Sequence, residues 1–455
     1  GALVVMQDGR VAGIFTERDI LKRIVAAGRD PKTTPVGKVM SEDVLTCTRA
    51  TTIGEVQSTM RTKRIRHLPV VDDGQLVGIG TSRQGHGVPP VVLLCAGEQR
   101  PCGQGDPGNI ALALAKGARQ RGALIVEHTG VTGLVRQGRR VTGVDYTTTE
   151  GNGHIACDLV INCAGMWGRE VGRMAGVNVP LQACEHFYIV SEPISGLEQL
   201  PVLRVPDECA YYKVDAGKLM LGAFEPKAKP WGPPRPDFEF DQLPEDVDHF
   251  EPILDMAINR MPILAQAGIH TFFNGPESFT PDNAYHLGLA PEMDNVWVAA
   301  GFNSIGIQSA GGAGMALAQW IEDGAKPFDL GDVDIARMQP FQGNARYLRE
   351  RASETLGLLY ADHYPYRQKA SARGVRRTPF HAQLAERGAV FGELAGWERA
   401  NWFARDGQDR DYRYSWRRQN FFDNVAEELA AVRTGVAMYD MSSFGKLRVE
   451  GPDAE

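Results

Sequence analysis

Apolar and polar residues alternate over residues 1–80 in a pattern that occurs twice. The apolar run ALVVM comes first, RVAGIFT follows and ERDILKRIVAAG comes third, which predicts two strands and a helix. The segment 35–80 repeats this pattern of strands and a helix and ends in two β-rich runs. Asp8-Gly9 and Asp73-Gly74 each separate two such runs, and this is typical of a hairpin turn. The pattern predicts an internal repeat.

A second pattern, an apolar strand followed by small residues and a helix, also occurs twice. In residues 158–176, DLVINCAGMWGREVGRMAG, a buried strand leads through Ala164-Gly165 into a helix. In residues 296–324, VWVAAGFNSIGIQSAGGAGMALAQWIEDG, we expect the helix to open at Gly311–Gly314. Glycine permits close backbone approach, and a helix start offers free N–H groups to an electron-rich cofactor edge. A glycine-rich turn without a ligand is the alternative interpretation.

The segments between these patterns predict an α/β arrangement. PGNIALALAKGARQRG predicts a helix with Asp106 as its N-cap. ALIVEHTGVTGL and VTGVDYTT predict an antiparallel ribbon that turns at residues 137–140. Residues 181–295 contain more aromatic residues, prolines and short strands, which we expect in a substrate domain built on an antiparallel sheet.

One glycine motif needs to be weighed against a plainer interpretation. GQGDPG, Gly103–Gly108, fits the dinucleotide fingerprint G-x-G-x-x-G. The residues AGEQRPC separate it from the preceding apolar run, whereas a dinucleotide site needs the glycine turn directly at the strand end. The helix cap at Asp106 is therefore the favoured explanation. The Gly/Pro-rich stretch 81–105 is the best linker candidate.

The composition limits the class of protein. A chain of 455 residues with 43% hydrophobic and 23% charged residues should hold two or three globular domains. The net charge of −7 argues against nucleic-acid binding. The seven cysteines are dispersed, which predicts reduced thiols in a cytoplasmic protein and no metal site. No run of 18 apolar residues occurs, so we expect no membrane segment.

Three further motifs, together with the two strand–helix segments, carry a family resemblance. They are EHFYIVSEPI, YYKVDAGKLMLGAFEPKAKPW and GPESFTPDNAYHLGLAPEMDNVWVAAGF. In this order they resemble the dimethylglycine/sarcosine dehydrogenase family of FAD-dependent amine oxidoreductases. Residues 1–80 resemble a pair of CBS domains, a regulatory module that binds adenosine nucleotides in many members. Both ends of this module are shorter than the family pattern, so we expect a truncated pair.

The resemblance implies a mixed α/β (α+β) fold in five parts. These are a truncated CBS pair at 1–80, a junction at 81–105, an incomplete flavoprotein core of the DAO type at 106–335, a central connecting domain at 336–410 and the start of an aminomethyltransferase (glycine-cleavage T-protein-like) domain at 411–455. The family's N-terminal glycine fingerprint has no counterpart here. We therefore expect a fragment or fusion with impaired FAD binding, and a tetrahydrofolate site lost through truncation.

The function implied by the resemblance is oxidative N-demethylation of a methylated glycine, with FAD as cofactor. The flavin-proximal positions that it implies are Val131, Trp167, Asn303, Ser304, Ile305, Gly306, Ile307 and Gln308. For Trp167, a core anchor for the following helix is the alternative. His186 and Tyr188 alternate on one strand face and are candidates for contact with a substrate carboxylate or amine, with ordinary packing as the alternative.

The CBS-like module carries its own candidate site. In that family the Thr of a G-h-h-T-x-x-D pattern, where h is a hydrophobic residue, contacts a phosphate and the Asp contacts the ribose hydroxyls. Here the pattern implies Thr16 and Asp19 for these two contacts. Thr16 is also a plausible helix N-cap. The rival function is therefore a non-catalytic protein that senses adenosine nucleotides, and the CBS resemblance also implies pairing into a homodimer.

Two groups of polar residues receive structural interpretations. Glu225, Lys227 and Asp282 lie in turn-rich segments, where solvated loop residues are the default. Residues 338–420 are rich in arginine and aromatic residues, and stacked arginines in an interdomain connection are favoured over a polyanion-binding surface.

Overall fold

The computed structural model describes residues 2–7, 9–16, 19–31, 33–48, 50–51, 53–63, 65, 67–72, 74–81, 91–93, 105–198, 200–235, 238–239, 241–361, 363, 366–446 and 448–451. The chain forms two compact units. The first contains Gly1–Leu114, Leu200–Val202 and Ala318–Leu330. The second contains Ala115–Gln199, Leu203–Leu317 and Gly331–Glu455.

The first unit contains the repeated hairpins. β1 (Ala2–Gln7) pairs antiparallel with β2 (Arg10–Thr16), and β3 (His67–Asp72) pairs antiparallel with β4 (Gln75–Thr81), as the sequence predicts. The turn residues Asp8 and Asp73 lie outside the described residues. β5 (Val91–Leu93) adds a third strand beside β4. It lies in the segment predicted as a junction, the rest of which is described only at residues 81 and 105.

Helices complete the first unit. The helix expected after β2 is a π-helical segment, η1 (Ile20–Val25), and α2 (Ile53–Lys63) precedes β3. The buried core consists of Cys47, Val56, Met60, Leu68, Val70 and Val77. Further along, α3 (Pro107–Gln120) begins as predicted, because Asp106 Oδ1 accepts a 2.7 Å hydrogen bond from the backbone N–H of Asn109.

The predicted ribbon is present in the second unit with one more strand than expected. β6 (Gly130–Gln137), β7 (Arg140–Thr148) and β8 (Gly151–Ala156) form a three-stranded antiparallel sheet. Residues 123–129 were expected to extend β6 but are irregular. The buried side chain of Asn295 accepts a hydrogen bond from the N–H of Val141 at 2.9 Å, and so holds the ribbon at the base of the next sheet.

A small sheet in the order β15-β16-β9 carries both strand–helix segments. β9 (Val160–Asn162) pairs in parallel with β16 (Val296–Ala300), and β15 (His286–Leu289) pairs antiparallel on the other side of β16. The expectation of a buried strand is wrong for β9, since Ile161 is 43% exposed. Among the described residues β9 has a pairing partner on one side only, so it forms an edge.

Each of these two strands is followed by a tight turn and then a helix. η3 (Gly165–Trp167) and α4 (Gly168–Ala175) follow β9. α6 (Gly306–Asp323) follows β16 and begins five residues before the expected opening at Gly311. The glycines at 311, 312 and 314 lie inside this helix, because the chain turns earlier, at Asn303 and Ser304.

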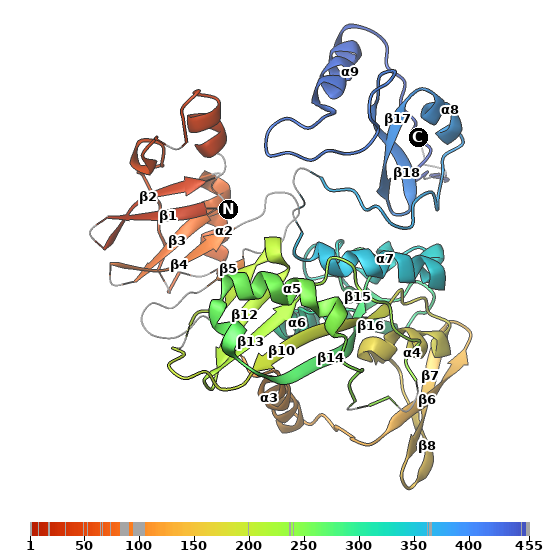
Figure 1. Ribbon diagram of the computed structural model, residues 1–455. Coiled ribbons are helices and arrows are strands. Elements are labelled where there is room, and N and C mark those ends of the chain that lie inside the picture. Colours follow the sequence, from red (N-terminus) through yellow and green to blue (C-terminus); the bar gives the residue numbers. More distant parts are fainter. Residues whose placement is uncertain are drawn as a thin grey trace. The chain divides into compact units, whose positions relative to one another are not determined.

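The predicted antiparallel substrate sheet is the largest sheet. Its order is β11 (Leu203–Val205), β12 (Ala210–Asp215), β13 (Lys218–Ala223), β10 (Gln182–Ser191) and β14 (Ile269–Phe279). α5 (Val247–Arg260) lies along one face and contacts β13 (Figure 1). The core between them includes Phe187, Ile189, Leu219, Leu221, Phe250, Ile253 and Phe272.

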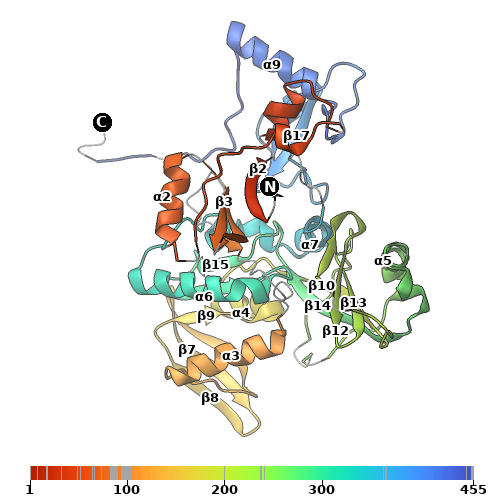
Figure 2. The same ribbon diagram turned by 90° about the vertical axis from the view of Figure 1, so that its left-hand side faces the viewer.

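The C-terminal part contains three helices, α7 (Ala345–Leu358), α8 (His381–Glu386) and α9 (Phe422–Thr434). It also contains the hairpin of β17 (Ala389–Leu394) and β18 (Trp397–Phe403). Figure 1 labels all five elements, and Figure 2 shows α7, β17 and α9 from the side. Short 3-10 helices occur at η2 (Val36–Lys38), η4 (Pro206–Glu208), η5 (Pro262–Gln266), η6 (Ile335–Arg337) and η7 (Pro340–Gly343). No helix in the described ranges is long and apolar enough to cross a membrane.

The arginines of this part are packed as structural residues. Arg351 is 1% exposed and its Nη1 lies 2.8 Å from Oε2 of Glu393. The guanidinium of Arg376 stacks over the ring of Trp397, with its carbon 4.1 Å from the ring centroid. These contacts favour the interpretation of stacked arginines in a connecting region.

Candidate functional site

The site is built on the face of the substrate sheet opposite α5. His186 lies on this face of β10, and its side chain is 14% exposed. Its Nδ1 lies 3.2 Å from Oε2 of Glu225, and its Nε2 lies 4.0 Å from Oε2 of Glu277. The rings of Phe224 and Phe279 pack edge-on against the imidazole. His186 therefore has a carboxylate near each ring nitrogen and an aromatic ring against each of two edges.

These carboxylates set the charge of His186. Burial lowers its pKa, but the hydrogen bond that its ring donates to Glu225 and the charges of Glu225 and Glu277 outweigh burial, so the pKa is raised above its usual value. The expectation that Glu225 is a solvated loop residue is wrong, because Glu225 is 1% exposed. It lies two residues after the end of β13, where the chain is still buried, whereas Lys227 is exposed as expected.

Asp282 also differs from the solvated residue that the sequence predicts. Its two carboxylate oxygens accept hydrogen bonds from Arg337, from Nε at 2.8 Å and from Nη2 at 3.0 Å. Burial raises its pKa, but the bond and charge of Arg337 outweigh burial and leave the pKa lowered. This bidentate pair fixes the turn after β14.

Glu277 connects His186 with the loop before α6. One of its oxygens accepts a 2.9 Å hydrogen bond from the backbone N–H of Ser304, and the other accepts one from the Ser304 hydroxyl. Its side chain is 37% exposed on the same face as His186. The structure therefore brings together two predicted groups that are far apart in sequence, His186 on the sheet and Ser304 in the expected flavin loop.

The loop is held in an uncommon conformation. Asn303 and Ser304 have φ values of +50° and +63°, in the left-handed region. The side chain of Asn303 is 1% exposed, and its Oδ1 accepts a 2.9 Å hydrogen bond from the N–H of Thr280. Gly301 is required beside it, since an added Cβ would lie 2.5 Å from Leu181 and 2.7 Å from Thr280.

The remaining predicted loop residues form the start of α6. Ile305 precedes the helix, and Gly306, Ile307 and Gln308 form its first turn, whose N–H groups have no partner within the helix. Ile307 is 47% exposed. Open space also lies beyond the backbone of Gly311, Gly312 and Gly314, where an added Cβ would meet nothing within 4 Å. This stretch of helix offers N–H groups and a bare backbone to a flat ligand.

Tyr188 and Tyr211 form the aromatic part of the sheet face. Tyr188 stacks on Phe273 with ring centroids 4.7 Å apart. Tyr211 lies across Gly222, where an added Cβ would come within 2.0 Å of its ring. Burial raises the pKa of Tyr211 to about 12, and the charge of Glu277 adds to the effect. Tyr211 was not predicted from the sequence. The signal for it is Gly222 on the next strand, because a glycine opposite a tyrosine leaves room for the ring.

Trp167 lies at the same end of the small sheet as the α6 loop. β9 and β16 are parallel, so their carboxyl ends lie at one edge, where ligands commonly bind in such sheets. Asn162 Nδ2 donates a 2.7 Å hydrogen bond to the Gly168 carbonyl and fixes the turn that contains Trp167. Val131 is 43% exposed on β6, a strand that contacts α4. No described contact joins Val131 to Ser304.

The candidate nucleotide site of the first unit is an internal contact. Oδ2 of Asp19 accepts hydrogen bonds from the N–H of Thr16 at 2.9 Å and from its hydroxyl at 2.7 Å. Arg23 lies 3.5 Å from the other oxygen, and Asp19 is 8% exposed. This geometry is that of a capping interaction. Nucleotide binding at these residues stays a prediction.

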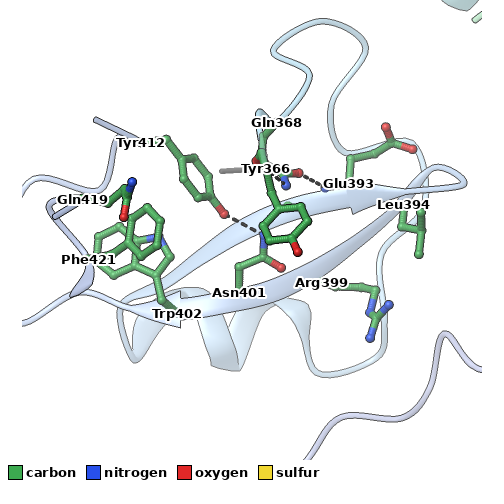
Figure 3. Close-up of a pocket in the computed structure, with 11 residues that line it drawn as sticks. Tyr366, Gln368, Glu393, Leu394, Arg399, Asn401, Trp402, Tyr412, Gln419 and Phe421 are labelled. Carbon is green, nitrogen blue, oxygen red and sulfur yellow. Dashed lines mark hydrogen bonds between the residues drawn. The ribbon is translucent and has the colours of Figure 1, made fainter. Parts of the chain in front are cut away.

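A separate cavity of about 550 Å³ lies in the C-terminal part (Figure 3). Tyr366, Trp402, Tyr412 and Phe421 supply aromatic walls, and Asn401 donates a 2.9 Å hydrogen bond to the hydroxyl of Tyr412. Burial raises the pKa of Tyr412 to about 12. None of the residues predicted from sequence lines it. No cluster of metal-ligating side chains occurs among the residues that the structure describes.

Four family models match the chain. The FAD dependent oxidoreductase model matches residues 70–320, the FAD dependent oxidoreductase central domain 323–378, and the GCVT N-terminal domain 380–455. The CBS domain model matches residues 1–26 and 36–84. These matches confirm the mixed fold and the resemblance to CBS and aminomethyltransferase-like domains.

Three curated relatives are similar over 77% of this chain. A 4-methylaminobutanoate oxidase (formaldehyde-forming) from Paenarthrobacter nicotinovorans is 46% identical over 355 residues, 42% of its length. The mitochondrial sarcosine dehydrogenase and dimethylglycine dehydrogenase of Homo sapiens are 35% and 34% identical, each over 41% of its length. This chain thus spans less than half of each relative. Because the flavoprotein model covers more than half of this chain, and the site residues lie within it, the chain belongs to the FAD dependent oxidoreductase family.

Proposed function

We propose that this chain carries the substrate-binding part of an oxidoreductase that removes the methyl group from an N-methylated glycine. The observation that supports this most is the position of Glu277, which hydrogen-bonds Ser304 and whose carboxylate lies 4.0 Å from His186 without a hydrogen bond to it. Glu277 thus lies between the polar and aromatic face of the substrate sheet and the loop before α6, which is the segment expected to contact a flavin ring. The printed names of all three relatives give an N-methylated amino acid, and two of them, sarcosine and dimethylglycine dehydrogenase, give an N-methylated glycine.

The residues at the start of α6 suit the ring end of FAD. The N–H groups of Gly306, Ile307 and Gln308 would stabilise negative charge on a reduced ring, and the exposed Ile307 would contact its apolar part. Trp167, which is half-buried after the end of β9, would form a flat apolar wall on one side of the flavin ring. When bound, FAD would supply the two-electron oxidation of the N-methyl carbon. Impaired binding of its ADP half stays a prediction from the sequence.

His186 is proposed to bind the substrate carboxylate. Burial opposes protonation of His186, but the two carboxylates outweigh burial and raise its pKa, which favours the form that can donate from both ring nitrogens. Tyr211 remains a neutral hydrogen-bond donor at neutral pH, because its pKa is about 12. Both groups can donate a hydrogen bond to a substrate carboxylate, while Glu225 and Glu277 beside His186 supply negative charge for the substrate ammonium.

Glu277 is proposed to face the amine. A substrate ammonium must lose a proton before its nitrogen lone pair can form the C=N bond of the oxidised product. Glu277 is partly exposed, and Ser304 holds its carboxylate in place with two hydrogen bonds. Hydrolysis of the C=N bond would then release formaldehyde and the demethylated amine.

The test is retention and reduction of flavin by the full chain. Purified protein is incubated with FAD, freed from unbound cofactor, and mixed with dimethylglycine or sarcosine without oxygen. Because binding of the ADP half is predicted to be impaired, we expect partial retention of yellow flavin. The retained flavin should bleach with either amine, and more slowly in His186→Gln. A protein that stays colourless after FAD incubation would oppose the enzyme assignment, whereas retained flavin that no amine bleaches would oppose the substrate class.

A second function is proposed for the CBS module, supported by the family match over residues 1–26 and 36–84. We propose that Thr16 and Asp19 bind an adenosine nucleotide and that two copies pair through this module. AMP or ATP should raise the melting temperature of the wild type and not of Asp19→Ala. Equal shifts in both proteins would argue that the Thr16–Asp19 contact is only a helix cap.

The compartment is also a proposal. The cysteines of the described segments, Cys47, Cys157, Cys163, Cys184 and Cys209, are free thiols. Free thiols suit a reducing compartment such as the cytoplasm. Thiol labelling of protein isolated under acid quench would test this, since oxidised cysteines would contradict it.

A further inference from the structure

A second, charged cavity lies in the second unit and involves none of the residues assigned above. It measures about 200 Å³ and is lined by residues of α4, the start of β10, the turn at residues 231–234 and α7. Gln182 Nε2 donates a 2.7 Å hydrogen bond to the carbonyl of Trp231 and ties the turn to β10. The cavity would hold about six water molecules, enough room for a small solute.

Arginines dominate the charge of this cavity. Its lining includes Arg169 and Arg173 from α4 and Arg349 from α7, and Glu170 is the one carboxylate among its described lining residues. Arg173 lies 4.0 Å from Glu170, which is a loose contact. Of the carboxylates in the described ranges, none lies within 4.0 Å of Arg169 or Arg349. The lining therefore carries more positive than negative charge.

The hydrogen bonds of these arginines leave most of their donors available. Arg169 Nη2 donates to the carbonyl of Gly343 at 2.8 Å, and this bond fixes the guanidinium at the wall. Arg349 Nη1 reaches the carbonyl of Gly232 at 3.5 Å, which is a weak bond. Each guanidinium has five N–H donors in a planar fork. The uncommitted donors can serve a ligand.

The crowding of cations is itself unfavourable. Burial lowers the pKa of Arg169, and the charge of Arg173 lowers it further, while Glu170 offsets only part of the effect. The chain as a whole carries a net charge of −7, so its overall field does not draw anions to the surface. An anion in this cavity would relieve a local excess of positive charge.

We propose that this cavity binds a small oxyanion, a phosphate or a carboxylate group, among Arg169, Arg173 and Arg349. The guanidinium fork matches the oxygen spacing of both groups and binds them in pairs of hydrogen bonds. A cation is disfavoured by the three arginines. The proposal is independent of the reaction at His186, because it rests on other residues and other elements.

The test is calorimetry of the full chain with inorganic phosphate and with succinate, at constant ionic strength. Arg349→Gln removes a cavity arginine, and Arg173→Gln removes another in case the first variant does not fold. Arg346→Gln is the matched control, since Arg346 lies on α7, is 88% exposed and pairs with Glu350. All three variants lose one positive charge.

We expect one of the two anions to bind, with an affinity at least tenfold lower in Arg349→Gln and Arg173→Gln and unchanged in Arg346→Gln. Preference for phosphate or for succinate identifies the group. The proposal is overturned if neither anion releases heat beyond a chloride control. It is also overturned if the cavity variants bind as well as Arg346→Gln, which would place the anion elsewhere, for example in the CBS module.

Discussion

Two buried histidines illustrate how position decides charge. His186 and His286 both lie in the second unit, yet the pKa of His186 is raised and that of His286 is lowered to about 4. The difference lies in the partners. His186 meets Glu225, whereas His286 is fully buried, hydrogen-bonds the carbonyl of Pro180 and lies near the charge of Arg337. The sequence shows the alternation that places His186 on the sheet face but not the partner that charges it.

Replacing Glu225 with glutamine should lower the pKa of His186 and destabilise the fold. The carboxylate is buried, so its loss removes a charge-assisted hydrogen bond that contributes about 2 kcal/mol. Glu192→Gln is the matched control, because Glu192 forms a pair of similar length with His270 at the surface and should change stability by less than about 1 kcal/mol. Urea unfolding and histidine NMR titration measure both effects. Equal losses in the two variants would contradict the assignment.

The neutral state of His286 predicts sensitivity to acid. Its pKa is about 4 in the fold, against an ordinary value of 6.5, so the unfolded chain binds the extra proton between those pH values. Stability therefore falls as pH falls from about 6.5 to about 4, by about 3 kcal/mol from this residue. In His286→Gln, which can still donate to Pro180, the dependence should flatten. Denaturation at several pH values checks this; an unchanged slope would contradict it.

At the scale of elements, the order and type of most segments follow from the sequence. The hairpins, the α3 cap and the antiparallel sheet agree with the apolar patterns, because local turn chemistry and alternation determine them. The start of α6 does not follow, since the glycines near 311 suggest a loop. Contacts of Asn303 with Thr280 and of Ser304 with Glu277 begin the helix earlier, and both partners are distant in sequence.

A glycine-to-alanine pair tests the space along α6. In Gly311→Ala the added methyl group meets nothing within 4 Å, so stability should rise by about 0.5–1 kcal/mol through better helix propensity. Gly357→Ala in α7 is the contrasting variant, because its methyl group would lie 2.6 Å from the backbone of Pro226 and should destabilise the fold. Thermal unfolding measures both. A loss of stability in Gly311→Ala would show that its side of the helix is covered.

The loop before α6 should depend on Asn303 more than on the side chain of Ser304. Asn303→Ala loses the bond to Thr280 and places alanine at φ +50°, with an expected cost of about 2 kcal/mol. Ser304→Gly keeps the backbone N–H that binds Glu277 and relieves φ +63°, so stability should change little. Chemical denaturation compares them. A larger loss in Ser304→Gly would assign the loop's stability to the hydroxyl.

At the scale of the whole molecule, four family matches lie along the chain in the order that the motifs indicate, and the CBS and flavoprotein matches overlap at residues 70–84. The chain spans less than half of each relative, so its activity is a proposal. The family follows from sequence because its motifs are long and ordered. The two cavities do not, because Tyr366 and Phe421, like Arg169 and Arg349, meet only through the fold.

The most direct measurement is the affinity of the full chain for dimethylglycine, determined by calorimetry for the wild type, His186→Gln and His270→Gln. Dimethylglycine should bind the wild type and His270→Gln equally, because His270 is a surface residue, 49% exposed. It should bind His186→Gln at least tenfold more weakly, which corresponds to about 1.4 kcal/mol. Equal affinity in all three proteins, or no binding to the wild type, would contradict a carboxylate site at His186.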